Sequence, residues 1–133
     1  MMIPKHQTKQ SAGADLYAAE TVTIESGQVR LVGTGFSLPE LGYIAAYHDL
    51  VFMLCNRSSL AFKKQLMICN GVGVIDQDYK DEIKAMFINM SDKPQTINKG
   101  ERIAQLVPMR YVSCLFDVED NERNGGIGST GNE

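Results

Sequence analysis

Two carboxylates and a tyrosine near the middle of the chain are the strongest candidates for chemistry. Residues 73–75 are small or β-branched and predict a strand, and Asp76, Asp78 and Tyr79 follow it directly. An aspartate in hydrogen-bond reach can deprotonate a water, strand backbone can pair with the edge of a base, and a tyrosine ring can exclude a sugar hydroxyl. A pocket-lining hairpin over residues 70–79 needs a turn after Asp76, since alternation would otherwise point Tyr79 away from the aspartates. The alternative is an acidic turn with a core tyrosine.

A second group of residues suits an anionic phosphate chain. Arg57, Ser58 and Ser59 combine a guanidinium, two hydroxyls and free backbone N–H groups at the start of a short helix predicted over residues 57–64. The serines suit the helix cap, and lysines lie in the last turn. The alternative is an ordinary helix start with a solvated arginine.

Two further polar residues, Asp15 and Gln105, indicate a function only in combination with the other stretches. Asp15 follows a run of small residues and by itself is typical of a turn with an exposed acid. Gln105 shares a strand face with Ile103 and Val107, so we expect its amide to have a partner, either in the protein or in a ligand. On the same strand, Arg102 is expected to be a structural ion-pair partner rather than a ligand contact.

Residues 122–133 are rich in glycine and are predicted to form a flexible arm rather than part of the core. The stretch lacks the lysine of the Walker pattern, and no helix is predicted after it, so it is not a phosphate loop. It could be a lid whose amides, hydroxyls and Arg123 close over phosphates bound elsewhere, or a disordered tail. We therefore expect one folded domain over residues 1–121 and a separate arm.

The elements that must position these groups are mainly strands. Short apolar runs are separated by glycine, proline, asparagine and aspartate, and only residues 57–64 form a credible helix. Many short strands with little helix predict an all-β fold, a sandwich or a distorted barrel, in one domain. The predicted strands lie near residues 21–25, 28–32, 43–48, 50–55, 66–69, 72–76, 82–88, 95–97, 102–107 and 110–116.

The composition argues against several classes of function. With 44% hydrophobic residues, 22% charged residues and a net charge of −3, the chain gives no electrostatic reason to expect a nucleic-acid polymer or a membrane as partner. The first residues lack the apolar stretch of a signal peptide or membrane span, so we expect a cytosolic protein. Cys55, Cys69 and Cys114 are expected to be buried free thiols, and His6 and His48 match no zinc-ligand spacing.

In order and spacing, the five stretches resemble the five motifs of the trimeric dUTP pyrophosphatase (dUTPase) family, and the likeness extends over residues 12–131. The resemblance implies a distorted β-barrel or jelly roll and a homotrimer with three shared active sites. One subunit would supply the first, second and fourth motifs, a second the uracil-reading hairpin, and a third its arm. The resemblance also implies hydrolysis of dUTP to dUMP and pyrophosphate, which keeps uracil out of DNA, with Mg²⁺ as cofactor.

The resemblance further assigns roles to individual residues. Asp76 would activate the water that attacks the α-phosphorus in line, Tyr79 would exclude ribose, and Asp15 would act on Mg²⁺ through water. Uracil would be read by Asn70, by the backbone of Val74, Ile75 and Asp76, and by Lys84. Phosphates would be held by Arg57, Ser58, Ser59 and Gln105, and the site would be closed by Arg123, Ile127, Gly128, Ser129 and Thr130.

Four positions differ from the usual pattern of that family. Ser59 and Asp81 stand where glycines are usual. Ile127 stands where a phenylalanine commonly stacks on uracil, and Arg123 lies one residue nearer the glycine pair than in the commonest spacing.

Two other functions remain open. The triplet that begins at Arg57 is also typical of dCTP deaminases, which share this fold, but Met86 stands at the position of their catalytic glutamate and cannot move a proton. Alternatively, a ligand-gated trimer of this kind could bind a regulatory protein partner when nucleotide orders the arm.

Overall fold

The computed structural model describes residues 3–113, 115–119 and 121. The predicted arm, residues 122–133, lies outside the described residues. The described part holds nine strands, one α-helix and two short 3-10 helices, which confirms the all-β prediction. No helix in this part is long and apolar enough to cross a membrane. The elements are β1 (Ala14–Tyr17), β2 (Val22–Ile24), β3 (Val29–Gly33), η1 (Leu38–Glu40), η2 (Ile44–Ala46), β4 (Leu50–Asn56), α1 (Ser58–Lys64), β5 (Leu66–Ile68), β6 (Gly73–Asp76), β7 (Lys84–Asn89), β8 (Gln95–Ile97) and β9 (Arg102–Arg110).

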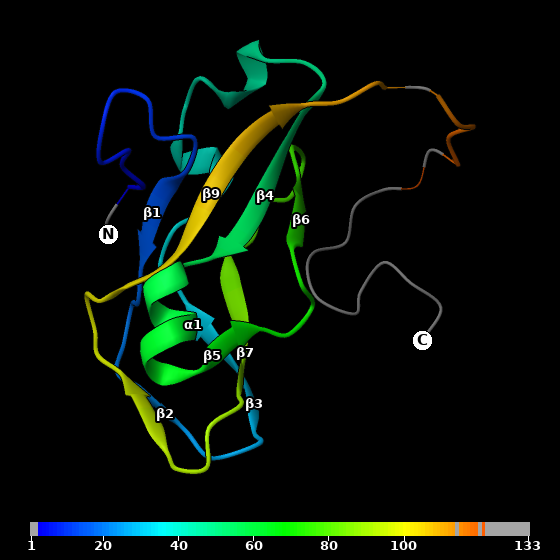
Figure 1. Ribbon diagram of the computed structural model, residues 1–133. Helices are drawn as coiled ribbons and strands as arrows, with labels where there is room; N and C mark the ends of the chain where they lie inside the picture. The colour runs from blue at the N-terminus through cyan, green and yellow to red at the C-terminus, as the bar shows by residue number, and fades with distance from the viewer. Residues whose placement is uncertain (1–2, 114, 120, 122–133) are drawn as a thin grey trace.

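The strands form three antiparallel sheets with the orders β1-β9-β4-β6, β3-β7-β5 and β2-β8. β4 and β9 are the longest strands and lie side by side through the middle of the molecule, with α1 following β4 directly (Figure 1). Leu54 and Leu106 face each other at the centre of that pair. One hydrophobic core joins the sheets, and its largest fully buried side chains include Phe36, Phe87, Leu16, Ile24, Leu38 and Leu66.

The strand predicted over residues 43–48 is wrong, because this segment forms η2. Its turns close through hydrogen bonds from Ala46 N to Tyr43 O at 3.0 Å and from Tyr47 N to Ile44 O at 3.2 Å. The two alanines have a weak preference for strands, which explains why tertiary contacts can hold the segment in a tight helical turn. This segment therefore presents backbone carbonyls to other parts of the chain.

The last predicted strand, over residues 110–116, is also wrong, because β9 continues to Arg110 and no strand follows it among the described residues. β9 pairs with β1 only as far as Leu106, so Pro108 lies where β9 has one neighbouring strand and a missing N–H is tolerated. β1 is not among the predicted strands, which begin at residue 21. Its four residues become a strand through pairing with β9 rather than through their own propensity.

The helix prediction is confirmed in its extent but not in its cap. Arg57, not a serine, is the N-cap residue, and its side chain makes no capping hydrogen bond. Lys63 and Lys64 lie in the last turn as predicted. Gln65 ends the helix in the left-handed region with φ of 52°, and its N–H donates to Ala61 O at 3.0 Å. α1 therefore places Ser58 and Ser59 in its first turn, directly after β4.

Candidate active site

One cavity of about 510 Å³ brings together three stretches that the sequence singles out. β1 supplies the first stretch, α1 the second and β9 the third, because β9 pairs with β1 on one side and with β4, which leads into α1, on the other. We call this cavity the arginine pocket. It is lined by Gln7, Ser11, Ala12, Gly13, Asp15, Arg57, Ser58, Ser59, Arg102 and Gln105.

Two arginines converge on one buried carboxylate in the arginine pocket. Asp15 is only 7% exposed, so the predicted exposed acid is wrong. Its Oδ1 lies 3.7 Å from Arg57 Nε and its Oδ2 lies 3.4 Å from Arg102 Nη1, which confirms the predicted ion-pair role of Arg102. Arg57 Nη1 also donates to Arg102 O at 3.4 Å. Two guanidinium groups share one carboxylate, so the pocket keeps net positive charge that suits an anionic ligand.

Gln105 has the partner that its apolar strand face predicts. Its Nε2 donates to Asn56 O at 3.3 Å, and the side chain is half-buried at the pocket wall. Gly13 lies against it so closely that a Cβ there would be 2.5 Å from Gln105 Oε1 and 3.0 Å from Gln105 Cβ. The glycine is thus required by the position of Gln105, a role that the sequence reasoning missed although Gly13 precedes Asp15 by two residues.

The acidic stretch lies elsewhere, at the end of β6. Beyond Asp76 the chain makes the predicted turn, closed by a hydrogen bond from Tyr79 N to Asp76 O at 3.1 Å. Tyr79 packs against the core and its Oη donates to Glu82 O at 3.2 Å, whereas Asp76 is exposed. β6 pairs with β4 while β7 pairs with β3 and β5, so the turn connects two sheets and the predicted hairpin is wrong.

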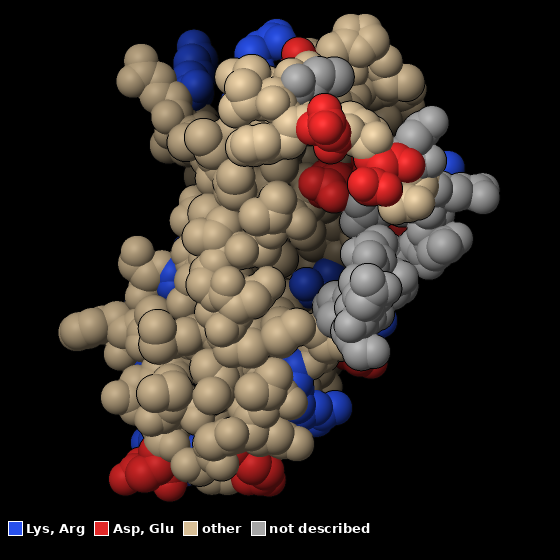
Figure 2. Space-filling model, turned by 90° about the vertical axis from the view of Figure 1, so that its right-hand side faces the viewer, with Lys and Arg blue, Asp and Glu red and all other residues tan. Residues whose placement is uncertain are grey.

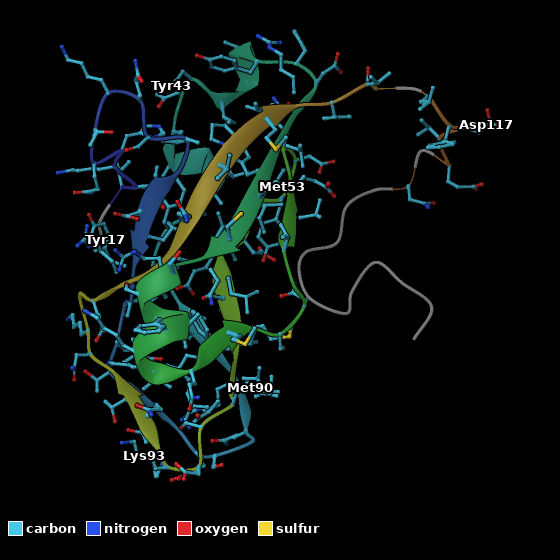
Figure 3. All side chains as sticks on the ribbon, in the orientation of Figure 1. Tyr17, Tyr43, Met53, Met90, Lys93 and Asp117 are labelled. Atoms are coloured by element: carbon cyan, nitrogen blue, oxygen red, sulfur yellow. The ribbon has the colours of Figure 1, made fainter. Side chains whose placement is uncertain are left out.

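A second cavity, of about 800 Å³, lies beside this turn, and we call it the β6 cavity. Acidic side chains gather in the upper part of this side of the molecule (Figure 2), and Met53, labelled on β4 in Figure 3, faces the cavity. Its lining residues are Ile44, Ala45, Leu50, Val51, Met53, Val74, Asp76, Gln77, Asp78 and Tyr111. None of them lines the arginine pocket, so within one chain Asp76 and Arg57 belong to separate cavities.

Other predicted base-reading residues are dispersed. Asn70 is exposed before β6, and Lys84 is exposed at the start of β7 beside a third cavity that Glu82 also lines. A Cβ at Gly73 would lie 3.1 Å from Leu54 Cβ, so that glycine serves the pairing of β6 with β4 rather than the approach of a ligand. The predicted closing residues Arg123, Ile127, Gly128, Ser129 and Thr130 lie outside the described residues.

The described residues hold no group of three or more histidine, cysteine, aspartate or glutamate side chains that could bind a metal ion alone. Mg²⁺ commonly needs only one or two carboxylates when nucleotide phosphates complete its coordination, and Asp15 fits that requirement. Of the cysteines, Cys55 is half-buried and Cys69 is exposed, so the prediction of a buried Cys69 thiol is wrong. Cys114 lies outside the described residues.

Comparison with known proteins gives one consistent result. A family model described as dUTPase matches residues 1–131. The deoxyuridine 5'-triphosphate nucleotidohydrolase of Nautilia profundicola is 43% identical to this chain over 136 residues, which cover 98% of this chain and 91% of that protein. The protein of the same name from Helicobacter pylori strain P12 is 40% identical, with 98% and 89% covered.

Solved structures agree with the sequence comparisons. The crystal structure of dUTPase from Streptococcus mutans superposes with a TM-score of 0.74 at 37% identity, covering 87% of this chain and 89% of that one. A mutant dUTPase of Staphylococcus bacteriophage 80alpha with dUpNHpp superposes with a TM-score of 0.71 at 26% identity, covering 92% of each chain.

Proposed function

This chain belongs to the dUTPase family, and we infer from that membership that it is a dUTP diphosphatase, which hydrolyses dUTP to dUMP and pyrophosphate. The observation that carries the proposal within the structure is the arginine pocket. It gathers two guanidinium groups, three serine hydroxyls and two glutamine amides in one cavity, which are groups that bind a triphosphate. Family membership indicates which nucleotide is the substrate, and the arginine pocket is the proposed binding place for its phosphates.

We propose that a complete site needs more than one copy of the chain. The arginine pocket and the β6 cavity share no lining residue, so within one chain Asp76 does not line the pocket proposed for the phosphates. In a homotrimer, the turn of one subunit would face the arginine pocket of another. The arm, residues 122–133, would then close the site through Arg123, Ile127, Gly128, Ser129 and Thr130 of a third.

An exposed apolar sheet face supports this association. Val29 and Leu31 on β3 and Met67 on β5 are 48%, 43% and 47% exposed. Val29 and Met67 both pair with Ile88 of β7, and Leu31 follows Val29 by two residues, so the four side chains share one face of the β3-β7-β5 sheet. Contiguous exposed apolar surface of this kind commonly marks an interface.

For the nucleoside half of the site, we propose that Asp76 orients and deprotonates the attacking water. Tyr79, held between the core and Glu82 O, would leave no room for a ribose 2′-hydroxyl. The outer edge of β6 would offer fixed backbone groups to uracil, and cytosine would leave them unpaired because its donor and acceptor pattern is inverted. The proposed base-reading residues are Asn70, Val74, Ile75, Asp76 and Lys84.

For the phosphate half, we propose that Arg57, Ser58, Ser59 and Gln105 hold the triphosphate in line with the attacking water. Arg57 would approach the triphosphate with its guanidinium positioned by Asp15 and by Arg102 O. Mg²⁺ bound on the phosphates, with Asp15 reaching it through water, would neutralise charge that builds up on the α-phosphorus and the leaving group. The protein's own residues therefore contribute positioning and one base.

One assay of the purified chain with Mg²⁺ tests the function. We expect pyrophosphate release from dUTP and no appreciable release from dTTP, dCTP or UTP. Ammonia release from dCTP would instead support a deaminase, which Met86 on β7 disfavours because a thioether cannot transfer a proton. No turnover of dUTP would overturn the proposal.

A regulatory role is a second candidate function. Phage dUTPases such as that of phage 80alpha are described as controlling the transfer of virulence genes by a proto-oncogenic G protein-like mechanism. If this chain acts similarly, nucleotide binding would change its affinity for a protein partner. A pull-down that captures a defined partner equally well with and without dUpNHpp would count against such gating.

A further inference from the structure

We propose that Gln77 is a positioning residue for catalysis, and that its side-chain amide fixes the turn carrying Asp76 and Tyr79 against residues 41–50, which we call the η2 segment. The inference rests on the proposed dUTP hydrolysis and deepens it. Gln77 follows Asp76 directly and is half-buried in the wall of the β6 cavity.

The Gln77 side chain uses both its donor and its acceptor groups on distant backbone. Its Nε2 donates to Tyr47 O at 2.5 Å and to Ile44 O at 3.1 Å. Its Oε1 accepts from Leu50 N at 3.4 Å. A primary amide is the side-chain group that offers two donors and an acceptor in this arrangement. The contact is therefore chemically specific rather than a general packing contact.

The turn lies at a point where the sheet no longer constrains it. The pairing of β6 with β4 reaches Val51 and Asp76, and Gln77 is the first residue beyond that register. Asp76 itself is exposed, so burial does not fix its carboxylate. Gln77 thus extends the constraint of the sheet by one residue, at the residue next to the proposed base.

The η2 segment is attached to the core at its two ends, although η2 itself has no buried residue. Ile44 and Leu50 pack against the hydrophobic core, and the carbonyls of Ile44, in η2, and of Tyr47, the residue after η2, accept from Gln77. At the end of the segment, Asp49 adopts the left-handed region with φ of 56°, and its carbonyl accepts from Tyr111 N at 3.0 Å. Core contacts and this hydrogen bond hold the η2 segment, and the Gln77 amide links the turn to it.

A positioning residue should affect turnover more than substrate binding. A displacement of about 1 Å at a reacting group can cost about a hundredfold in rate, whereas the phosphates would remain held in the arginine pocket. Loss of the Gln77 contacts should therefore lower kcat while KM changes little. It should also weaken discrimination against UTP, because Tyr79 belongs to the same turn.

The test compares Gln77→Met and Gln77→Asn with the unmodified chain. Methionine keeps the length of the side chain and removes the amide, while asparagine keeps the amide on a shorter stem. A matched control is Gln28→Met, because Gln28 Oε1 accepts from Glu25 N at 2.9 Å across a turn whose residues line neither cavity. The measurements are kcat and KM for dUTP, the ratio of kcat/KM for dUTP and UTP, and the thermal unfolding midpoint.

We expect Gln77→Met to lower kcat by about tenfold or more with KM within about threefold, and Gln77→Asn to lose less. Gln28→Met should leave kcat unchanged. Unchanged kcat and selectivity in a folded Gln77→Met would overturn the inference while the dUTPase activity stands, and absence of dUTP turnover in the unmodified chain would overturn the proposed function instead. If Gln77→Met does not fold, Gln77→Asn decides: full activity overturns the inference, and a reduced kcat with unchanged KM supports it.

Discussion

The two halves of the proposed site are built by different kinds of interaction. In the arginine pocket, charge holds the side chains, since Arg57 and Arg102 both approach the buried carboxylate of Asp15. At the turn of residues 76–79, a neutral amide holds the backbone, since within the described part of the chain the Gln77 side chain bonds only to main-chain groups of the η2 segment. The arginine pocket offers charged side chains for phosphates, and the turn offers a fixed position for the proposed general base, Asp76, and for the ring of Tyr79.

This difference indicates how each half tolerates change. The arginine pocket depends on three strands meeting, because β1, β9 and β4 are neighbours in one sheet. It carries two positive charges, so loss of one arginine should weaken phosphate binding without abolishing it. The turn has one carboxylate in the proposed chemical role, so a change there acts on the rate directly. Substitutions should therefore separate into rate effects at the turn and binding effects at the pocket.

The largest effect is expected from Asp76→Asn. The amide cannot accept a proton from water at neutral pH, and loss of a general base typically costs a factor of about 10² to 10⁴ in rate, so we expect kcat to fall by about a thousandfold. Binding of dUpNHpp, measured by calorimetry, should be retained because the phosphates are proposed to be held by the arginine pocket. Asp92→Asn, at an exposed aspartate beyond β7, is the matched control and should leave kcat unchanged. Full activity of Asp76→Asn would remove Asp76 from its assigned role.

A smaller effect is expected from Arg57→Lys in the other half. Lysine keeps the charge but loses the planar fork that reaches Asp15, Arg102 O and a phosphate together. We expect kcat/KM for dUTP to fall by about tenfold to a hundredfold, mainly through KM. Steady-state kinetics on Asp76→Asn and Arg57→Lys compares the two halves. If the loss for Arg57→Lys lies entirely in kcat with no change in KM, Arg57 acts in the chemical step instead.

Only part of the arginine pocket could be foreseen from local pattern. The strand pattern predicted an ion-pair partner for Arg102 and a partner for the Gln105 amide, and both are present. It also placed the two side chains on different faces, although both line the pocket. The burial of Asp15 could not be foreseen, since it depends on β1 joining the sheet through β9. Local pattern identified the residues, while strand pairing determined their surroundings.

The role of Gln77 could not be predicted for a related reason. Its partners are backbone groups of Ile44, Tyr47 and Leu50, which lie 27 to 33 residues earlier in the chain. The sequence predicts a strand over residues 43–48, whereas this segment forms η2 and an extended residue Tyr47, and the carbonyls of Ile44 and Tyr47 accept from the Gln77 amide. The wrong strand prediction over residues 43–48 therefore meant that the contact of Gln77 with this segment could not be predicted, although the turn that contains Gln77 was expected.

A close glycine in each half allows the comparison to be sharpened. Gly13→Ala would place a Cβ 2.5 Å from Gln105 Oε1 and 3.0 Å from Gln105 Cβ, so rotation of the amide alone cannot relieve the contact. Gln105 must move within the arginine pocket, and we expect KM for dUTP to rise about fivefold with kcat within about twofold. Steady-state kinetics measures both, and an unchanged KM would mean that Gln105 does not hold phosphate.

The smallest effect is expected from Gly73→Ala, the counterpart near the turn. Its Cβ would lie 3.1 Å from Leu54 Cβ and 3.4 Å from Leu54 Cδ2, inside the pairing of β6 with β4 rather than in either cavity. Overpacking of this kind costs about 1 kcal/mol when neighbours can shift by a few tenths of an ångström. We therefore expect a lower midpoint in urea unfolding, with kcat and KM for dUTP within about twofold of the unmodified chain. A kcat loss as large as that of Gln77→Met would show that the register of β6, and not the amide of Gln77, sets the position of Asp76.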